Sequence, residues 1–278
     1  MNKAQFQQQS PIAPQICYVL GTGHCGSTLL SMMLNMSEQI FACGEIQRME
    51  WGRTGKGAAA EFWKDVFEQL NTPGIHAENA RLFDPKELKR SADLDTWRRF
   101  NLDALQAILD ASGAELVLDA SKSPARLRAL LEAQAGNIKV IHLVRDSRAV
   151  VHSFHRKFKT FSRGWRRGKA RVEYLDAESQ ELSAIVPDQY WFLLRYEDLI
   201  DRPDFHINLL CEFLDVEFQP SMLWPDPSAY FGVGGNRMRS KPFRGFHKDQ
   251  SWRADRGLLW RLLTTIAVRR INSRYGYY

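Results

Sequence analysis

Cysteine is scarce in this sequence, with four residues in a chain of 278. No two of them form a C-x-x-C pair and they are too few for a disulfide framework, which predicts unpaired thiols in a reducing compartment. Long apolar runs are also lacking, because no stretch reaches the roughly 18 residues of a transmembrane helix. Residues 1–15 lack the apolar core of a signal peptide. We therefore expect a cytoplasmic protein with no membrane partner and a flexible tail over residues 1–15.

The composition is that of an ordinary globular protein, with 44% hydrophobic and 12% aromatic residues and no repeats or low-complexity segments. A chain of this length can bury a substantial core, so residues 16–278 are predicted to form a single domain. The formal net charge of +6 favours an anionic partner. That charge is compatible with several classes of anionic partner: nucleotides, sulfated or phosphorylated small molecules, nucleic acid and membrane surfaces.

Short apolar runs bounded by turns alternate with segments of helical periodicity. This alternation predicts an α/β fold with a central, mainly parallel sheet. The runs are almost continuously hydrophobic, which indicates a sheet covered by helices on both faces, in three layers. Functional groups are then expected at the carboxyl ends of the strands. The runs cover residues 16–20, 40–43, 115–120, 138–144 and 190–196.

A long region separates the second and third runs, at about residues 45–112. It contains the segments "AAAEFWKDVFEQL" and "DTWRRFNLDALQAILDAS", both with helical periodicity. We interpret this region as a helical insertion lying over the functional site. The next unit, residues 115–144, is predicted to be a compact strand-helix-strand unit.

The turn after the first run, "GTGHCGSTLL", fits two nucleotide-binding patterns, each imperfectly. Gly21, Gly23 and Gly26 fit the G-x-G-x-x-G turn of dinucleotide folds, while the P-loop pattern fits except that Ser27 replaces its lysine. Both patterns aim backbone N–H groups at an anion, and an ordinary strand-turn-helix connection is the alternative. The missing lysine disfavours a nucleoside triphosphatase. Glu45 stands about 20 residues on, where a dinucleotide fold places its ribose-binding acid.

Residues 139–154, "KVIHLVRDSRAVVHSF", predict a second anion site. A buried strand runs into Arg145 and Asp146, and the helix that follows carries Ser153 about two turns on. The guanidinium of arginine holds several hydrogen-bond donors in a rigid plane, and serine has one hydroxyl donor on a short side chain. The two can therefore bind the same phosphate. The alternative is a salt-bridged helix start.

Taken together, these segments resemble the sulfotransferases that use 3′-phosphoadenosine 5′-phosphosulfate (PAPS), especially the bacterial and protein-tyrosine branches. The resemblance runs from about residue 18 to residue 252, in family order. It implies a P-loop-like α/β fold related to nucleotide kinases, PAPS as the sulfuryl donor, and no metal. The matching segments are "GTGHCGSTLL", "CGE", "DASKSP", "VIHLVRDSRAVVHS", "LLRYEDLI" and "GGNRMR".

The resemblance also implies the donor-binding residues. The loop would surround the 5′-phosphosulfate, Arg145 and Ser153 would bind the 3′-phosphate, and Tyr196 would lie near the adenine. A late loop would close over the donor. Strand-end packing is the alternative for Tyr196, and a solvated basic turn is the alternative for the late loop. The loop residues are Gly23, His24, Cys25, Gly26, Ser27 and Thr28, and the late-loop candidates are Asn236, Arg237 and Arg239.

Sulfuryl transfer to a hydroxyl needs a base for the acceptor proton and cations for the leaving phosphate oxygen. The resemblance implies Glu45 as the base and places Lys122 and Ser123 near the sulfuryl group, while a helix-capping acid is the alternative for Glu45. His24 departs from the family, which usually has lysine or arginine there. We expect His24 and Lys122 to share the leaving-group charge.

These observations predict a PAPS-dependent sulfotransferase acting on a hydroxyl of a small molecule or carbohydrate rather than a protein. A small-molecule or nucleotide kinase and a non-catalytic nucleotide-binding protein are the alternatives.

Residues 155–171 interleave eight Lys/Arg with aromatic residues. We interpret that segment as a pocket wall or a solvated helix face rather than a nucleic-acid site. His142 is predicted to be a strand residue and His152 to lie on a helix surface, neither with metal partners. The acceptor and the oligomeric state stay open.

Overall fold

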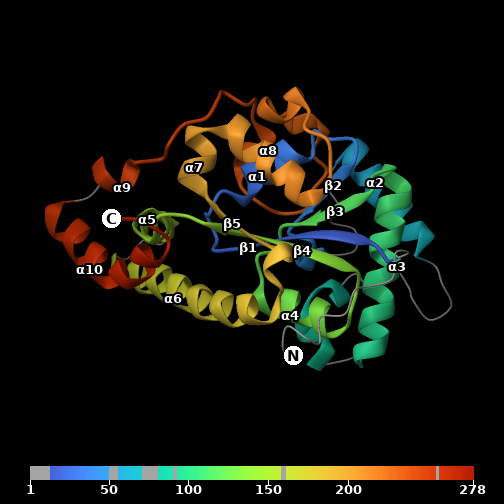
Figure 1. Ribbon diagram of the computed structural model, residues 1–278, viewed down its shortest axis with the longest axis horizontal. Helices are drawn as coiled ribbons and strands as arrows, with labels where there is room; N and C mark the ends of the chain where they lie inside the picture. Colours follow the sequence, from blue (N-terminus) through green and yellow to red (C-terminus); the bar gives the residue numbers. More distant parts are fainter. Residues whose placement is uncertain (1–12, 50–55, 71–80, 90–92, 158–160, 255–256) are drawn as a thin grey trace.

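The computed structural model describes residues 13–49, 56–70, 81–89, 93–157, 161–254 and 257–278 (Figure 1). The first strand begins at Gln15, so the end of the expected tail already belongs to the sheet, and residues 1–12 lie outside the described part of the chain.

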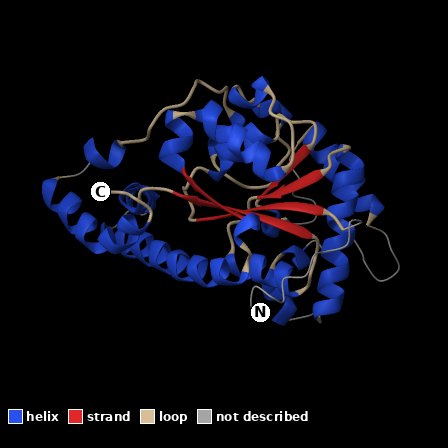
Figure 2. Cartoon of the chain, viewed as in Figure 1, coloured by secondary structure: helices blue, strands red, loops and turns tan. Residues whose placement is uncertain are grey.

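Five parallel strands form the central sheet, in the order β2-β3-β1-β4-β5. The predicted apolar runs all become strands, and the prediction of an α/β fold with a parallel sheet is confirmed. Figure 2 shows the strands gathered between helices. The strands are β1 (Gln15–Gly21), β2 (Ile40–Gly44), β3 (Leu116–Asp119), β4 (Asn137–Val144) and β5 (Trp191–Arg195).

Helices and short 3-10 turns connect the strands and follow the last of them. The helices are α1 (Ser27–Leu34), α2 (Ala58–Gln69), α3 (Leu94–Ser112), α4 (Pro124–Glu132), α5 (Ser147–Lys157), α6 (Phe161–Ile185), α7 (Tyr196–Asp201), α8 (Pro203–Leu214), α9 (Ser251–Ala254) and α10 (Leu258–Arg274). The turns are η2 (Ile46–Arg48), η4 (Pro85–Lys89), η5 (Asp188–Tyr190), η6 (Pro220–Leu223), η7 (Pro227–Ala229) and η8 (Arg237–Ser240).

The two faces of the sheet carry separate hydrophobic cores, because successive strand residues point to opposite faces. On β1, Cys17 and Val19 pack with α1, α7 and α8, while Ile16 and Tyr18 pack with α2, α3, α4 and α6. Figure 1 shows α1, α7 and α8 on one face and α4 and α6 on the other. The expected three layers are therefore present.

The helices of the region at residues 45–112 help to build one of these cores. Trp63 and Phe67 of α2 and Trp97 and Phe100 of α3 are almost fully buried in the cluster that includes Ile16. The helices predicted there are confirmed. They form part of a covering layer of the sheet.

A buried ion pair ties this layer to the carboxyl end of β3. The guanidinium of Arg126 lies 2.7 Å from Asp119 and also donates to the carbonyl of Phe83 and the side chain of Asn101. Arg126 and Asp119 are fully buried, so these contacts replace part of the water that the two charges lose. The pair thereby fixes α4 and α3 beside the strand end.

Asp119→Asn tests this pair, because it keeps the shape of the side chain and leaves the Arg126 charge without its counter-ion. We expect the free energy of unfolding in urea to fall by about 3 kcal/mol or more. Asp215→Asn is the matched control, since Asp215 pairs with Lys139 at an exposed position, and there we expect less than about 1 kcal/mol. Equally small losses in both variants would contradict the structural role of the buried pair.

Candidate active site

The glycine-rich loop joins β1 to α1 and leaves no room for side chains at two positions. A Cβ atom on Gly21 would lie 2.7 Å from the carbonyl oxygen of Leu143. Gly26 has φ of 103°, and a Cβ atom there would lie 2.3 Å from the ring of Tyr196. The glycines therefore let the loop approach both β4 and Tyr196 closely.

The N-terminus of α1 has features that favour binding of an anion. The helix begins at Ser27, no side chain caps its first N–H groups, and its first turn contains no acidic residue. Those N–H groups have no intrahelical partner, and the helix dipole favours negative charge beside them. Thr28 is buried, and its hydroxyl accepts a hydrogen bond from the backbone of Asn236 at 3.0 Å.

The thiol of Cys25 is fully buried in this loop, and that burial raises its pKa. A protonated, inaccessible thiol is a poor nucleophile. Cys25 therefore fills space beneath the loop.

His24 lies at the exposed tip of the loop with φ of 68°, and its ring meets the edge of Phe154. Partial burial lowers its pKa below the usual 6.5, and the charges of Lys157, Arg145, Arg156 and Lys122 lower it further. The neutral form of the imidazole is therefore favoured in the free protein.

Glu45 and Lys122 form a buried ion pair at the carboxyl edge of the sheet. Glu45 directly follows β2, Lys122 lies three residues past the end of β3, and Nζ is 2.8 Å from Oε1. Arg48 binds the other carboxylate oxygen at 2.9 Å. Glu45 makes no side-chain cap to η2, so the helix-capping alternative is not what the structure shows.

The turn that carries Lys122 is held by residues on both sides. Lys122 has φ of 59°, and its ammonium also donates to the carbonyl of Ala120. The hydroxyl of Tyr18 accepts from the backbone N–H of Ser123 at 3.0 Å and donates to the carbonyl of the same residue at 2.9 Å. Ser123 uses its own hydroxyl to cap α4 through Arg126. Tyr18 thus positions this turn, although its place in an apolar strand gave no sign of that role.

Arg145 lies between the loop and Tyr196. Its guanidinium donates to the carbonyl of His24 at 2.8 Å, stacks 4.6 Å from the centre of the Tyr196 ring, and pairs with Asp249 at 3.1 Å. Its Nε atom is buried with no hydrogen-bond partner. Partial burial opposes ionisation of Asp249, but hydrogen bonds from Ser251 and the charge of Arg145 lower its pKa to about 2.

Ser153, the expected companion of Arg145, donates to the carbonyl of Ala149 in its own helix. The salt-bridged helix start is also present, but it uses Arg148, which binds Asp146 at 2.8 Å. Asn272 of α10 donates to the same carboxylate and accepts from the backbone of Ser147. A residue more than a hundred positions away therefore fixes the turn that presents Arg145.

The late loop lies beside both Glu45 and α1. Val233 pairs with β2, and its carbonyl accepts from the backbone of Glu45 at 2.7 Å. Arg239 donates to the carbonyl of Gly232, and Arg237 is exposed. Together with the contact from Asn236 to α1, these bonds bring the predicted late-loop residues to the site.

The basic segment at residues 155–171 is divided between α5 and α6. Trp165 packs in a cluster with Val151 and Val172, and its indole donates to Thr264. It is therefore not available to stack on a base. Phe158 lies outside the described residues.

The expectation of a surface position for His152 is wrong. This residue is 1% exposed and meets the ring of Trp260 of α10 edge-on. His142 is a buried strand residue as expected, and burial lowers its pKa to about 4.

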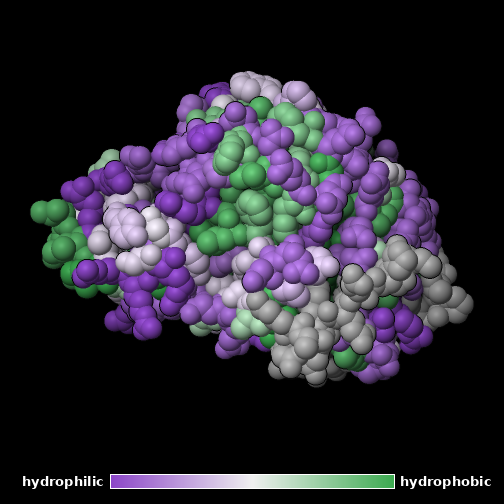
Figure 3. All heavy atoms as spheres, viewed as in Figure 1, coloured by the Kyte–Doolittle hydropathy of each residue, from purple (hydrophilic) through white to green (hydrophobic). Residues whose placement is uncertain are grey.

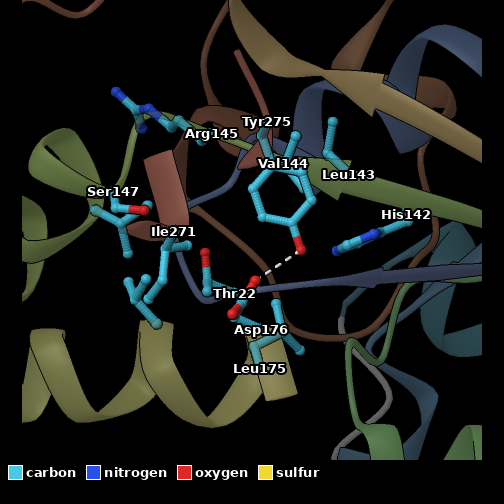
Figure 4. A pocket seen from close by; sticks show the side chains of 12 residues that line it. Thr22, His142, Leu143, Val144, Arg145, Ser147, Leu175, Asp176, Ile271 and Tyr275 are labelled. Carbon is cyan, nitrogen blue, oxygen red and sulfur yellow. Dashed lines mark hydrogen bonds between the residues drawn. The ribbon is translucent and has the colours of Figure 1, made fainter. Parts of the chain in front are cut away.

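A small cavity of about 20 Å³ lies behind the loop, between β4, α5, α6 and α10 (Figure 4). Thr22, His142 and Arg145 border it, and the Tyr275 hydroxyl donates to Asp176 at its edge. A nucleotide needs a pocket of several hundred Å³. The cavity is therefore a packing gap beneath the site and is too small to hold the donor.

No group of His, Cys, Asp and Glu side chains suited to a metal ion occurs among the described residues. In the same part of the chain, no helix combines the length and hydrophobicity needed to cross a bilayer.

The environment of His24 gives a direct prediction. In an NMR titration of the free protein, its imidazole should titrate below pH 6.5, because it is partly buried among cations. Lys157→Met removes one of those cations and should raise the midpoint, whereas Lys64→Met on α2 should leave it unchanged. A midpoint at or above 6.5 in the parent protein would contradict this account of the loop.

Several solved structures share this fold. A sulfotransferase domain from the Synechococcus PCC 7002 olefin synthase is 20% identical, with a TM-score of 0.61 over 99% of both chains. A sulfotransferase domain from the curacin biosynthetic pathway is 20% identical, with a TM-score of 0.57 over 95% of this chain and 98% of that one. Sulfotransferase STF9 from Mycobacterium avium is 14% identical, with a TM-score of 0.55 over 97% and 78% of the two chains. At these identities the likeness establishes the fold.

A search of the curated proteins found no match. A model of the sulfotransferase family, by contrast, matches residues 17–220, which is most of the chain. The matched segment contains the glycine loop, the Glu45–Lys122 pair, Arg145 and Tyr196. We conclude that this chain belongs to the sulfotransferase family, enzymes that take their sulfuryl group from PAPS.

Proposed function

We propose that this protein transfers the sulfuryl group of PAPS to a hydroxyl of a small-molecule or carbohydrate acceptor, with Glu45 as the general base. The observation that carries the proposal is the buried pair of Glu45 and Lys122 beside the glycine loop. It places a proton acceptor and a cation together where the strands end.

The residues present fit a donor with an anion at each end. The uncapped N-terminus of α1 suits the 5′-phosphosulfate, and residues 23–28 would hold it there. Arg145 suits the 3′-phosphate, because its buried Nε has no partner and one edge of its guanidinium is held only by the half-exposed Asp249. Ser153 would join it by rotating its hydroxyl away from Ala149. Tyr196, already stacked on Arg145, would lie beside the adenine.

When bound, the donor supplies the sulfuryl group and a phosphate leaving group. Glu45 takes the proton from the acceptor hydroxyl as the oxygen of that hydroxyl becomes the nucleophile. Lys122 stabilises the negative charge that develops on the leaving oxygen. Arg48 keeps a contact with the Glu45 carboxylate when Lys122 turns to that oxygen.

The partly buried aromatic residues Phe62 and Phe231, which pack on the core near the late loop, favour an acceptor with an apolar or sugar ring. Phe41 and Phe62 stack with ring centres 4.5 Å apart, and Phe62 also contacts Phe231. Phe231 stands two residues before Val233, whose carbonyl binds Glu45. Aromatic faces of this kind bind phenols and the apolar faces of sugars.

Arg145→Ala should weaken binding of 3′-phosphoadenosine 5′-phosphate (PAP) by about 2 kcal/mol more than it weakens binding of AMP, because only the first ligand loses a charge-assisted pair. Calorimetry without metal measures both affinities. Asp249→Asn should strengthen PAP binding by about two- to fivefold, since it removes a competing carboxylate. Equal losses of binding free energy for PAP and AMP in Arg145→Ala would show that Arg145 does not bind the 3′-phosphate.

Glu45→Gln keeps the side-chain shape and removes the proton acceptor. Turnover with labelled PAPS and a panel of phenols, alcohols and sugars should fall by about 10² or more, with PAP affinity nearly intact. Glu68→Gln is the matched control, because Glu68 pairs with Lys64 at an exposed site on α2. Unchanged turnover in Glu45→Gln would contradict its role as the base.

Binding of an anionic donor should raise the pKa of His24, which burial and nearby cations lower in the free protein. The added affinity is complete below the pKa of the free imidazole and is lost as pH rises through the pKa of the bound one. Activity should therefore fall on the alkaline side. His24→Lys should flatten that limb, and His24→Ala should lose much of kcat. An alanine variant with parental turnover would leave Lys122 as the sole leaving-group cation.

A further inference from the structure

Helix α10 is apolar on two opposite sides. Trp260, Thr264 and Val268 are buried and face the small core formed with α5, α6 and α9. At 3.6 residues per turn, the other side carries a stripe of large apolar residues. These are Leu258, Leu259, Leu262, Leu263 and Ile266, which are 74%, 69%, 54%, 50% and 63% exposed.

The other large apolar residues that are highly exposed in the described part of the chain are far apart in the sequence. Figure 3 shows the stripe as a hydrophobic patch at the end of the molecule occupied by α10, bordered by hydrophilic residues. Single exposed leucines are ordinary on protein surfaces, but a contiguous patch of this kind marks an interaction site.

The charge of this end of the molecule identifies the kind of partner. The described parts of residues 147–172 and 251–278 contain thirteen Lys and Arg and no acidic residue, although the whole chain is only +6. Three of these cations have a carboxylate partner nearby: Arg148 pairs with Asp146, Lys169 with Glu173, and Arg274 with Asp176. Helix α10 itself contains no acidic residue, and the exposed Arg269 and Arg270 continue the stripe toward its C-terminal end. A partner for this surface must therefore offer both negative charge and an apolar layer.

We propose that α10 docks on the surface of an anionic lipid bilayer, with the stripe in the interface and the arginines at the headgroups. Amphipathic helices bind bilayers through this combination of buried leucines and basic residues. A second copy of the chain is disfavoured, because it would bring two strongly positive ends together. A nucleic acid would use the arginines but not the leucines.

This proposal does not depend on the donor site or on the identity of the acceptor. It departs from the expectation that no membrane is involved, which rested on the lack of a spanning segment. A helix that lies in the interface needs no such segment.

Co-sedimentation with vesicles tests the proposal. The full chain should bind vesicles of equimolar phosphatidylcholine and phosphatidylglycerol, bind pure phosphatidylcholine poorly, and lose affinity as salt increases. The double variant Leu262→Ser, Ile266→Ser should bind about tenfold more weakly or worse. Arg269→Gln with Arg270→Gln should also weaken binding and reduce its salt dependence. Leu193→Ser is the control, because Leu193 is a comparably exposed leucine on β5.

Three results would overturn the proposal. The first is absence of binding to the anionic vesicles. The second is a dimer, seen by light scattering, that the double serine variant converts to a monomer without any vesicle binding. The third is vesicle binding that the arginine variant abolishes and the serine variant leaves unchanged, which would indicate a general polyanion surface.

Discussion

The ion pair between Glu45 and Lys122 is the interaction on which the rest of the site depends. Both side chains are buried, so each charge requires compensation that water no longer provides. Arg48 and the carbonyl of Ala120 supply part of it. The backbone around the pair is fixed as well, by Tyr18 at the Lys122 turn and by Val233 at Glu45. A carboxylate and an ammonium group, the proposed base and cation, are thus held together at one strand edge.

At the other end of the site, buried polar contacts hold the turn that carries Arg145. Arg145 projects from a turn that Asp146, Arg148 and Asn272 lock in place, yet its own guanidinium is incompletely satisfied. The carboxylate of Asp249 occupies one edge in the free protein. That arrangement keeps the Arg145 guanidinium oriented. In the proposed complex, the 3′-phosphate replaces the Asp249 carboxylate as its partner.

Much of this architecture could be predicted from the sequence, because strands and loop motifs are local patterns. The five strands, the glycine loop and the polar residues at the strand ends follow from short segments of chain. Tyr18, Asn272 and Asp249 could not be found in this way, since each acts through contacts with residues far away in the sequence. His152 was misplaced for the same reason: the ring that buries it belongs to α10.

A crystal structure with bound PAP tests the central claim most directly. We expect the 5′-phosphate at the first-turn N–H groups of α1, with Lys122 turned from Glu45 toward it. The 3′-phosphate should bind Arg145 in place of Asp249. A nucleotide bound elsewhere, or a 3′-phosphate in solvent with both the Arg145–Asp249 and Lys122–Glu45 pairs intact, would contradict the account.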